Sequence, residues 1–533
     1  MAPLNNVDGL VNLRNLVQEV NGTSPADKSV PIVFVPGFFG WGAPLFGAIN
    51  YFGGVINIPK LLVDEGYTVI VAPVAPISTN WERACELYRQ LTVGRFSTVN
   101  PATSLVDEVY DIEVDYGSYF AADPAHAPED NPSTGRRRAI LFPNSQFPND
   151  WTWDRSNKVH FICHSQGGNT VRYLISLMAN GSATWHPEYF GDGEDERDDW
   201  IVSVTTLGTP HRGTTIINAL DRFISRSRQQ AVSLVARLFA AASFYPAEKR
   251  AYDLQLDHWG ICRKKGETFQ DMLLRLESVD GPVWKWLTSN HNAFYDNSIE
   301  GVHDLSHKAI NTSGKVYYFS LSFHATVPFP EDWPAWGLDA INSFPTRLED
   351  FVRGATRNIP IVPWVVDGLI GIITSAGWSF LTTVTSFRSF VEWITDAVIA
   401  RISRELGYDL VFPKPGRYIP RKDVIPIMLL SVYAMGGQDL TQVQKNILGV
   451  NQEDWYQSDG IVNTESMRGP LNSARGISSL PDFDFSIPGK KGIYWHLGHN
   501  DQMDHADEIG VFIEQNTVRL QIPCRWSSLL TLE

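Results

Sequence analysis

The stretch His164-Ser165-Gln166-Gly167-Gly168 decides the fold of this 533-residue chain. An apolar run, residues 159–163, precedes it, and an amphipathic run, residues 169–178, follows it. A buried strand, a tight turn with serine at its apex and then a helix form a nucleophile elbow, in which the serine oxygen is lifted out of the sheet. The pentapeptide alone also fits an ordinary turn between a strand and a helix. The flanking runs therefore carry the interpretation.

Further apolar runs extend this pattern along the chain. The runs that we interpret as buried strands are residues 30–35, 67–71, 159–163, 201–207 and 316–321, and residues 80–91 have helical spacing. The alternation predicts an α/β fold with a mostly parallel central sheet that helices cover on both faces. Ligands of such sheets bind beyond the carboxyl ends of the strands, and Ser165 follows one of those ends.

The composition indicates a globular protein and narrows the classes of partner. Hydrophobic residues make up 43% of the chain, and the formal net charge is -15 at pH 7. Nucleic acids bind to basic faces, so this charge argues against them as partners. The first residues lack the charged and apolar segments of a secretory signal, and we therefore expect an intracellular protein.

Two segments interrupt the α/β pattern. We divide the chain into an N-terminal extension (1–29), a first part of the core (30–344), an insertion (345–425) and a second part of the core (426–533). Residues 94–158 of the first part are rich in Asp, Asn and Pro, and we interpret them as a loop-rich insertion. Residues 345–425 are apolar and amphipathic. Three interpretations stay open for them: a helical hairpin packed on the core, an interfacial helix that meets a membrane or lipid-droplet surface, and a transmembrane span.

An elbow serine needs a base, and the base needs an acid that orients it. In this fold the acid and then the histidine follow the serine in the chain. Asp459, in an Asp-Gly turn, is the candidate acid, with a plain turn aspartate as the alternative. His505, just before an apolar run, is the candidate base, with His496 and His499 as nearby rivals.

Backbone N–H groups are expected to stabilise the oxyanion of such a reaction. Gln166 supplies one donor by its position after the serine. The second is expected from the N–H of Phe38, in the glycine-rich loop of residues 36–42, because glycine lets a loop approach a substrate closely.

Taken together, these motifs resemble those of the thermoalkalophilic Bacillus-type and staphylococcal lipases. The matching segments are residues 31–42, 53–54, 78–86, 164–168, 203–206, 209–214, 252–260, 459–467 and 504–505. The resemblance implies an α/β-hydrolase fold and hydrolysis of lipid esters such as acyl glycerols, without a required cofactor. It also implies Ser165 as nucleophile, Asp459 as acid and His505 as base.

Other functions for the same residues remain open. A phospholipase, an acyltransferase or a transesterase would use the same triad, and a lipid-binding protein on a retired hydrolase fold is the non-enzymatic alternative. The sequence predicts no oligomeric state.

The zinc site of that family, built from two Asp and two His, maps onto this chain only in part. The resemblance places it on Glu82, His126 and Asp257, with Glu82 where the family has Asp and His258 as a substitute ligand. A structural zinc takes four ligands. The fourth position falls near Phe120, so a zinc site is an expectation that rests on three residues. No calcium site is predicted.

The family also has an amphipathic lid, which would correspond to residues 215–250. The residues expected to form its apolar face are Ala231, Leu234, Val235, Leu238, Phe239 and Ala242. A core helix shows the same stripe of apolar residues, so the lid is implied by the resemblance and not by the periodicity.

Overall fold

The computed structural model describes most of the predicted core and little of the insertion. The described residues are 27–45, 49–54, 56–100, 106–107, 109–111, 136–181, 190–191, 193–226, 228–250, 252–328, 417–421, 424, 428–450, 455–476, 489–501 and 503–511. Within them one sheet of ten strands has the order β13-β14-β10-β9-β8-β1-β2-β7-β3-β4. The neighbours from β13 to β2 all pair in parallel, so the predicted fold class is confirmed.

The strands of this sheet include every strand predicted from the apolar runs. Their bounds are β1 Ile32–Val35, β2 Val69–Val71, β3 Ser97–Val99, β4 Val106–Asp107, β7 Ile140–Phe142, β8 Val159–His164, β9 Ile201–Leu207, β10 Tyr317–Phe323, β13 Ala474–Gly476 and β14 Tyr494–Asn500. Two small antiparallel pairs lie outside it: β5 Tyr110–Asp111 with β6 Arg136–Arg137, and β11 Thr326–Pro328 with β12 Tyr418–Pro420.

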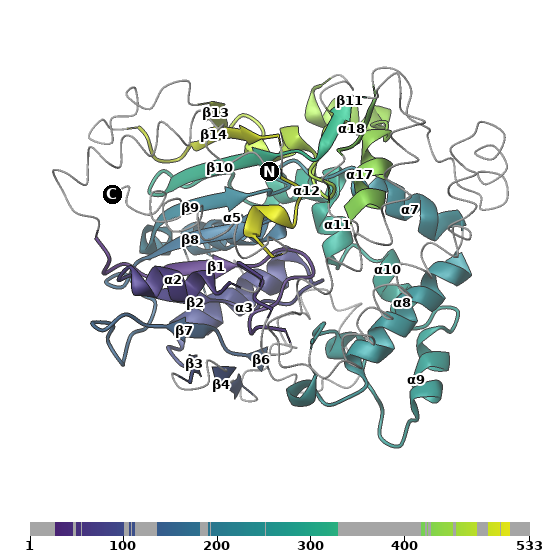
Figure 1. Ribbon diagram of the computed structural model, residues 1–533, viewed down its shortest axis with the longest axis horizontal. Helices are drawn as coiled ribbons and strands as arrows, with labels where there is room; N and C mark the ends of the chain where they lie inside the picture. Colours follow the sequence, from purple (N-terminus) through teal and green to yellow (C-terminus); the bar gives the residue numbers. More distant parts are fainter. Residues whose placement is uncertain are drawn as a thin grey trace.

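Helices surround the sheet (Figure 1). The α-helices are α2 Ile58–Asp64, α3 Asn80–Thr92, α5 Gln166–Asn180, α7 Ile216–Arg226, α8 Arg228–Ser243, α9 Phe269–Leu276, α10 Pro282–Thr288, α11 Ala293–Asn297, α12 Ile299–Lys308, α17 Leu429–Gly436 and α18 Gln442–Leu448. The short 3-10 helices are η2 Arg197–Trp200, η3 Ala247–Lys249, η4 Asp257–Trp259, η7 Thr464–Arg468 and η9 Asp507–Ile509.

Strand β1 shows why the sheet is covered on both faces. Successive side chains of a strand point to opposite faces. Ile32 and Phe34 pack with α2 and the C-terminal segment, whereas Val33 and Val35 pack with α3 and α5. All four side chains are fully buried. A strand buried on both faces reads as a continuous apolar run, which is why the sequence predicted it.

The described residues of the segment 94–158, which we interpret as a loop-rich insertion, include short strands. Strand β7 pairs with β2 in antiparallel fashion, and β3 and β4 continue the sheet beyond it. The sequence pattern missed these strands because each has only two or three residues, too few to show a period.

The predicted lid region, 215–250, contains helices α7 and α8, and the face that α8 buries overlaps the predicted one, because Phe239 is buried and Val235 and Ala242 pack against the same cluster. Val232, Ala236, Phe239 and Ala240 are buried among α9 and α10. Leu238, predicted on the apolar face, is 43% exposed. Helices α8, α9 and α10 pack together and form a lobe beside the central sheet (Figure 1).

The predicted insertion, 345–425, lies almost wholly outside the described residues. Its last part contains β12, which pairs with β11 and is therefore a strand and not a helix. Among the described residues, no helix has the length and the apolar composition that crossing a membrane requires.

Candidate active site

Ser165 lies at the junction of β8 and α5, as the elbow predicts. Its φ of 54° and ψ of -131° are rare for a residue with a side chain. The turn is held on both sides, because the Ser165 N–H donates to the carbonyl of Leu207 at 2.9 Å and its carbonyl accepts from the N–H of Gly168 at 3.1 Å. Strain of this kind persists only where the surrounding structure enforces it, and it is concentrated at functional sites.

The loop after β1 packs directly on this serine. A Cβ added to Gly37 would lie 2.4 Å from the Cβ of Ser165, so only glycine fits at this position. Arg83, fully buried on α3, holds this loop in place through hydrogen bonds to backbone carbonyls. Its guanidinium donates to the carbonyl of Pro36 at 2.5 Å and to that of Ala75 at 2.7 Å.

The two predicted oxyanion donors, Phe38 and Gln166, directly follow Gly37 and Ser165 in the chain. The loop amides that flank Phe38 are both engaged, since Gly37 N–H donates to Tyr51 Oη at 3.0 Å and Phe39 N–H donates to the carbonyl of Pro76 at 2.9 Å. Among the described residues, the Phe38 N–H has no such acceptor. Gln166 is the first residue of α5, where the N–H groups have no partner inside the helix.

Asp459 and His505, 46 residues apart, are brought into contact. The Oδ2 atom of Asp459 lies 2.7 Å from Nδ1 of His505, and the N–H of His505 donates to the carbonyl of Asp459 at 3.0 Å. The other carboxylate oxygen of Asp459 accepts from the N–H groups of Ile461 and Val462, at 2.8 and 2.7 Å. The Asp-Gly turn therefore aims the carboxylate at the imidazole.

The charges of this pair stabilise each other in a buried site. Burial alone would raise the pKa of Asp459, but the positive charge of His505 and the hydrogen bonds that it receives lower that pKa. Burial alone would lower the pKa of His505, but Asp459 and then Glu508 raise it to about 10. A carboxylate behind an imidazole thus favours the imidazolium form, which an acyl transfer creates.

The rival histidines lie elsewhere. Both His496 and His499 are on β14, and Nε2 of His496 is within 2.8 Å of the hydroxyl of Ser322. Burial lowers the pKa of His496 to about 3. Neither contacts Asp459 in the described structure, so His505 is the histidine that geometry joins to the acid.

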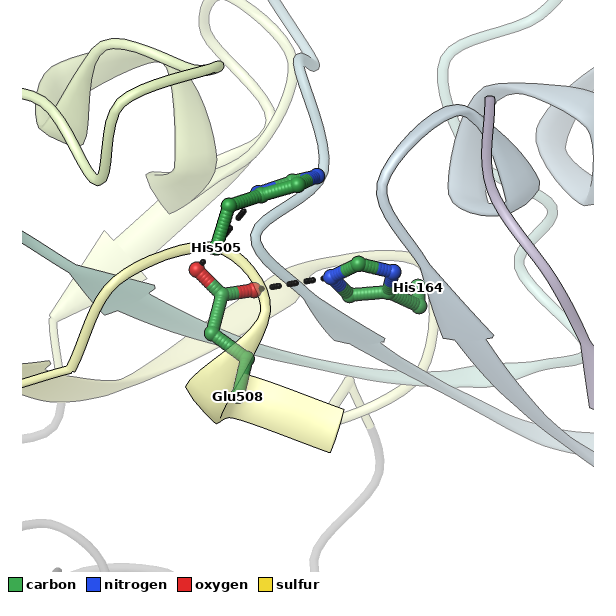
Figure 2. Close-up of side chains that lie close together, drawn as sticks. All are labelled: His164, His505 and Glu508. Atoms are coloured by element: carbon green, nitrogen blue, oxygen red, sulfur yellow. Dashed lines mark ion pairs between the residues drawn. The ribbon is translucent and has the colours of Figure 1, made fainter. Parts of the chain in front are cut away.

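The sequence analysis did not propose Glu508, whose side chain is completely buried next to His164 and His505 (Figure 2). Its Oε2 atom lies 3.2 Å from Nε2 of His164, and its Oε1 atom lies 3.7 Å from Nδ1 of His505. The rings of His164 and His505 are 4.4 Å apart between centroids, so the histidine before the elbow serine packs on the candidate base. The signal was present, because residues three apart on a helical turn face the same side, and Glu508 follows His505 by three.

Gly208, directly after β9, makes room for this glutamate. An added Cβ there would lie 2.0 Å from Oε2 of Glu508, and the φ of 55° at Gly208 also disfavours a side chain. The space that Glu508 occupies is therefore provided by the end of a neighbouring strand.

The residues predicted for zinc do not come together among the described residues. Both carboxylate oxygens of Asp257 accept from Arg250, at 2.8 and 3.1 Å. Glu82 lies 3.5 Å from Nε2 of His258. Of the described residues, only His164, His505 and Glu508 form a group of three or more with metal-ligand spacing. His126 lies outside the described residues, and the zinc site stays a prediction that the chemistry of Asp257 does not favour.

The elbow of Ser165 lies at the carboxyl edge of a parallel sheet, and Asp459 and His505 are in contact. This fold and these residues place the chain among the proteins with an α/β-hydrolase fold. The chain belongs to the family described as lipase-like, C-terminal domain, which matches residues 28–329. The predicted resemblance to the staphylococcal lipases is thereby confirmed.

Relatives of this chain are similar over part of their length. Lipase 2 of Staphylococcus aureus is 28% identical over 359 residues, which are 65% of this chain and 45% of that protein. Lipase 1 of Staphylococcus aureus strain MRSA252 is 29% identical over 297 residues, which are 54% of this chain and 37% of that protein. The chain therefore spans less than half the length of these curated relatives.

Solved structures support the same fold. EstA from Clostridium botulinum has a TM-score of 0.56 at 21% identity and covers 98% of this chain and 99% of its own. The lipase of Staphylococcus hyicus has a TM-score of 0.55 at 20% identity, with 95% of each chain covered. Lipase 1 of Pelosinus fermentans has a TM-score of 0.52 at 21% identity and covers 95% of this chain and 98% of its own.

Proposed function

We propose that this protein is a serine-dependent hydrolase of carboxylic esters that acts on lipid substrates such as acyl glycerols. The observation that carries the proposal is the Asp459–His505 contact of 2.7 Å beside the strained turn of Ser165. Membership of a lipase-like family supports an ester with an acyl chain as the substrate.

In the proposed mechanism, Ser165 Oγ attacks the carbonyl carbon of the ester while His505 Nε2 takes the serine proton. Asp459 holds the imidazole through Nδ1 and stabilises its charged form. The N–H groups of Phe38 and Gln166 stabilise the oxyanion, each contributing about 3 kcal/mol to transition-state stabilisation. His505 then gives its proton to the leaving alcohol, and water resolves the acyl-enzyme with His505 again as base.

Ser165→Ala tests this function. Turnover of a chromogenic acyl ester should fall by about 10⁴-fold or more, because the nucleophile and the unit that it forms with His505 are both lost. Circular dichroism and the unfolding midpoint serve as controls for the fold. Supplying alcohols as acceptors and identifying the products separates hydrolysis from acyl transfer, while a phospholipid substrate tests for a phospholipase. Undiminished turnover in the alanine variant would refute the proposal.

A further inference from the structure

We propose that Glu508, in its protonated form, is a positioning residue that braces Asp459 and His164 behind the catalytic pair. The inference rests on the proposed function, because it assigns a role to a group that acts through the candidate acid and base. It starts from the contacts of His164, which fix where the hydrogens of the cluster lie.

The hydrogen positions follow from Tyr51. Its Oη atom accepts the N–H of Gly37 at 3.0 Å, so its own hydrogen points to Nδ1 of His164, 2.7 Å away. Burial lowers the pKa of His164 well below its usual value, so the ring is neutral and carries its single hydrogen on Nε2. Nε2 lies 3.2 Å from Oε2 of Glu508, close enough for an ion pair, although the geometry of the two groups is not that of a hydrogen bond.

The other oxygen of Glu508 faces the catalytic pair. Its Oε1 atom lies 3.7 Å from Nδ1 of His505, but the hydrogen on that nitrogen is already committed to Asp459 at 2.7 Å. If Oε1 of Glu508 carries a hydrogen, Glu508 can donate it to the carboxylate of Asp459, which can only accept hydrogen bonds. Hydrogen bonding with Glu508 is among the causes that lower the pKa of Asp459.

The charge of Asp459 also favours the protonated form of Glu508, whereas the charge of His505 opposes it. The titratable groups against it are Tyr51, His164, Asp459 and His505, from four separate segments. Among the described residues, no arginine or lysine forms an ion pair with Glu508 or Asp459. Burial, and then the negative charge of Asp459, raise the pKa of Glu508 well above its usual value.

The consequence is a series of neighbouring buried groups across the site. Hydrogen bonds join His164 to Tyr51 and Tyr51 to the N–H of Gly37, which precedes the proposed oxyanion donor, and Glu508 lies next to His164. Glu508 thus joins the segment that bears the acid and the base to the loop that would bind the oxyanion. Positioning partners of this kind keep catalytic groups in one rotamer.

A metal ion is the competing explanation for the same group, since the ligand atoms of His164, His505 and Glu508 all lie within 4.8 Å of one another. The hydrogen bonds described above disfavour it. A metal on Nδ1 of His505 would have to displace the hydrogen that this nitrogen donates to Asp459.

The experiment compares Glu508→Gln and Glu508→Ala with the unchanged chain. A neutral amide can donate to Asp459 and accept from His164, so Gln should keep kcat/KM at pH 8 within about threefold on a short-chain chromogenic ester. Ala should lower kcat/KM by about tenfold or more, because it leaves two buried groups without a partner. The acid limb of the Gln profile should coincide with that of the unchanged chain, because a protonated Glu508 and a glutamine carry the same charge next to His505.

Asp198→Asn is the matched control, because Asp198 is a buried carboxylate next to Lys315, before the start of β9 and away from Ser165. It should keep the activity and the pH profile of the unchanged chain. Loss of activity in the Gln variant equal to that in the Ala variant would overturn the inference. A shift of the acid limb to lower pH in the Gln variant would also overturn it, because it would show that Glu508 carries a negative charge in the unchanged chain. The Gln variant decides the question even if the Ala variant does not fold.

Two further outcomes separate the explanations. Activity that EDTA or added Zn²⁺ changes in the unchanged chain but not in Glu508→Ala would overturn the inference in favour of a metal. If the unchanged chain neither turns over esters nor reacts with a serine-directed phosphonate, the proposed function fails and this inference fails with it. Full activity of Glu508→Ala in an active protein overturns only the role of Glu508.

Discussion

Two buried glutamates lie beside buried histidines in this protein, and their neighbours give them different chemistry. Glu508 lies 3.2 Å from His164, and Glu82 lies 3.5 Å from His258. Glu508 faces His164, His505, Tyr51 and the acid Asp459, and among the described residues it forms no ion pair with an arginine or a lysine. In the second region Asp257, the chain neighbour of His258, binds the permanent cation of Arg250. Buried acids next to an arginine form structural ion pairs, because the arginine is always positively charged. Buried acids next to histidines alone have no permanent positive charge beside them, so the acids and the imidazoles compete for a proton.

The largest effect on activity is expected from a substitution in the first region, around Asp459, His505 and Glu508. Asp459→Asn should lower kcat/KM by about 10⁴-fold, because an amide no longer holds His505 in the tautomer that accepts the serine proton. Steady-state kinetics on a chromogenic ester measure the change. Asp253→Asn, a buried acid of the second region that also binds Arg250, is the control and should leave kcat/KM of the folded protein nearly unchanged. If Asp459→Asn and Asp253→Asn lower kcat/KM equally, the first region has no special role in catalysis.

The second region should respond in stability and not in catalysis. Arg250→Met leaves Asp253 and Asp257 without their cation, so the free energy of unfolding should fall by about 3 kcal/mol. Urea unfolding followed by fluorescence measures this loss. Arg275→Met removes a more exposed pair with Glu267 and should cost less. A loss for Arg275→Met as large as that for Arg250→Met would show that burial of the acids does not set the cost.

The smallest effect is expected for a buried histidine that forms no ion pair with an acid among the described residues. His160 is on the same strand as His164 and lies 2.7 Å from the hydroxyl of Ser203. Burial lowers its pKa from 6.5 to about 4, so the unfolded chain binds one more proton than the folded chain between these values. Stability should therefore fall as the pH drops from 6.5 towards 4, by up to about 1.4 kcal/mol per pH unit from this residue.

Unfolding in urea at several pH values tests this last prediction. His160→Gln keeps a polar group for Ser203 but cannot take up the proton, so its stability should depend less steeply on pH in the same window. Parallel curves for the two proteins would contradict the assignment of a neutral His160.

The sequence predicted the parts of this molecule that repeat a simple pattern. Strands β1, β8 and β9 are almost entirely buried and largely apolar, so they are visible without a structure, although β8 and β9 also contain the polar residues His160, Ser203, Thr205 and Thr206. Strand β14 was missed because it carries His496 and His499 and pairs with β10 through an irregular register. Its burial depends on a neighbour far away in the chain, which no local pattern records.

The same limit explains the candidate site. Ser165, Asp459 and His505 could be proposed because each lies in a recognisable local motif. Glu508 was not proposed, because its spacing from His505 is the only local signal, and a glutamate in an acidic segment is typical of the surface until His164 and Gly208 are seen to enclose it. The burial face of α8 was predicted only in part for a related reason, since α9 and α10 determine which stripe is covered.

Gly208 carries a consequence for anyone who redesigns this protein or transfers the cluster to another scaffold. The missing side chain at 208 leaves the volume that the long acid at 508 occupies, and the φ of 55° at 208 disfavours a side chain there even when residue 508 is shortened. Libraries should therefore keep glycine at 208 and place all variation at 508.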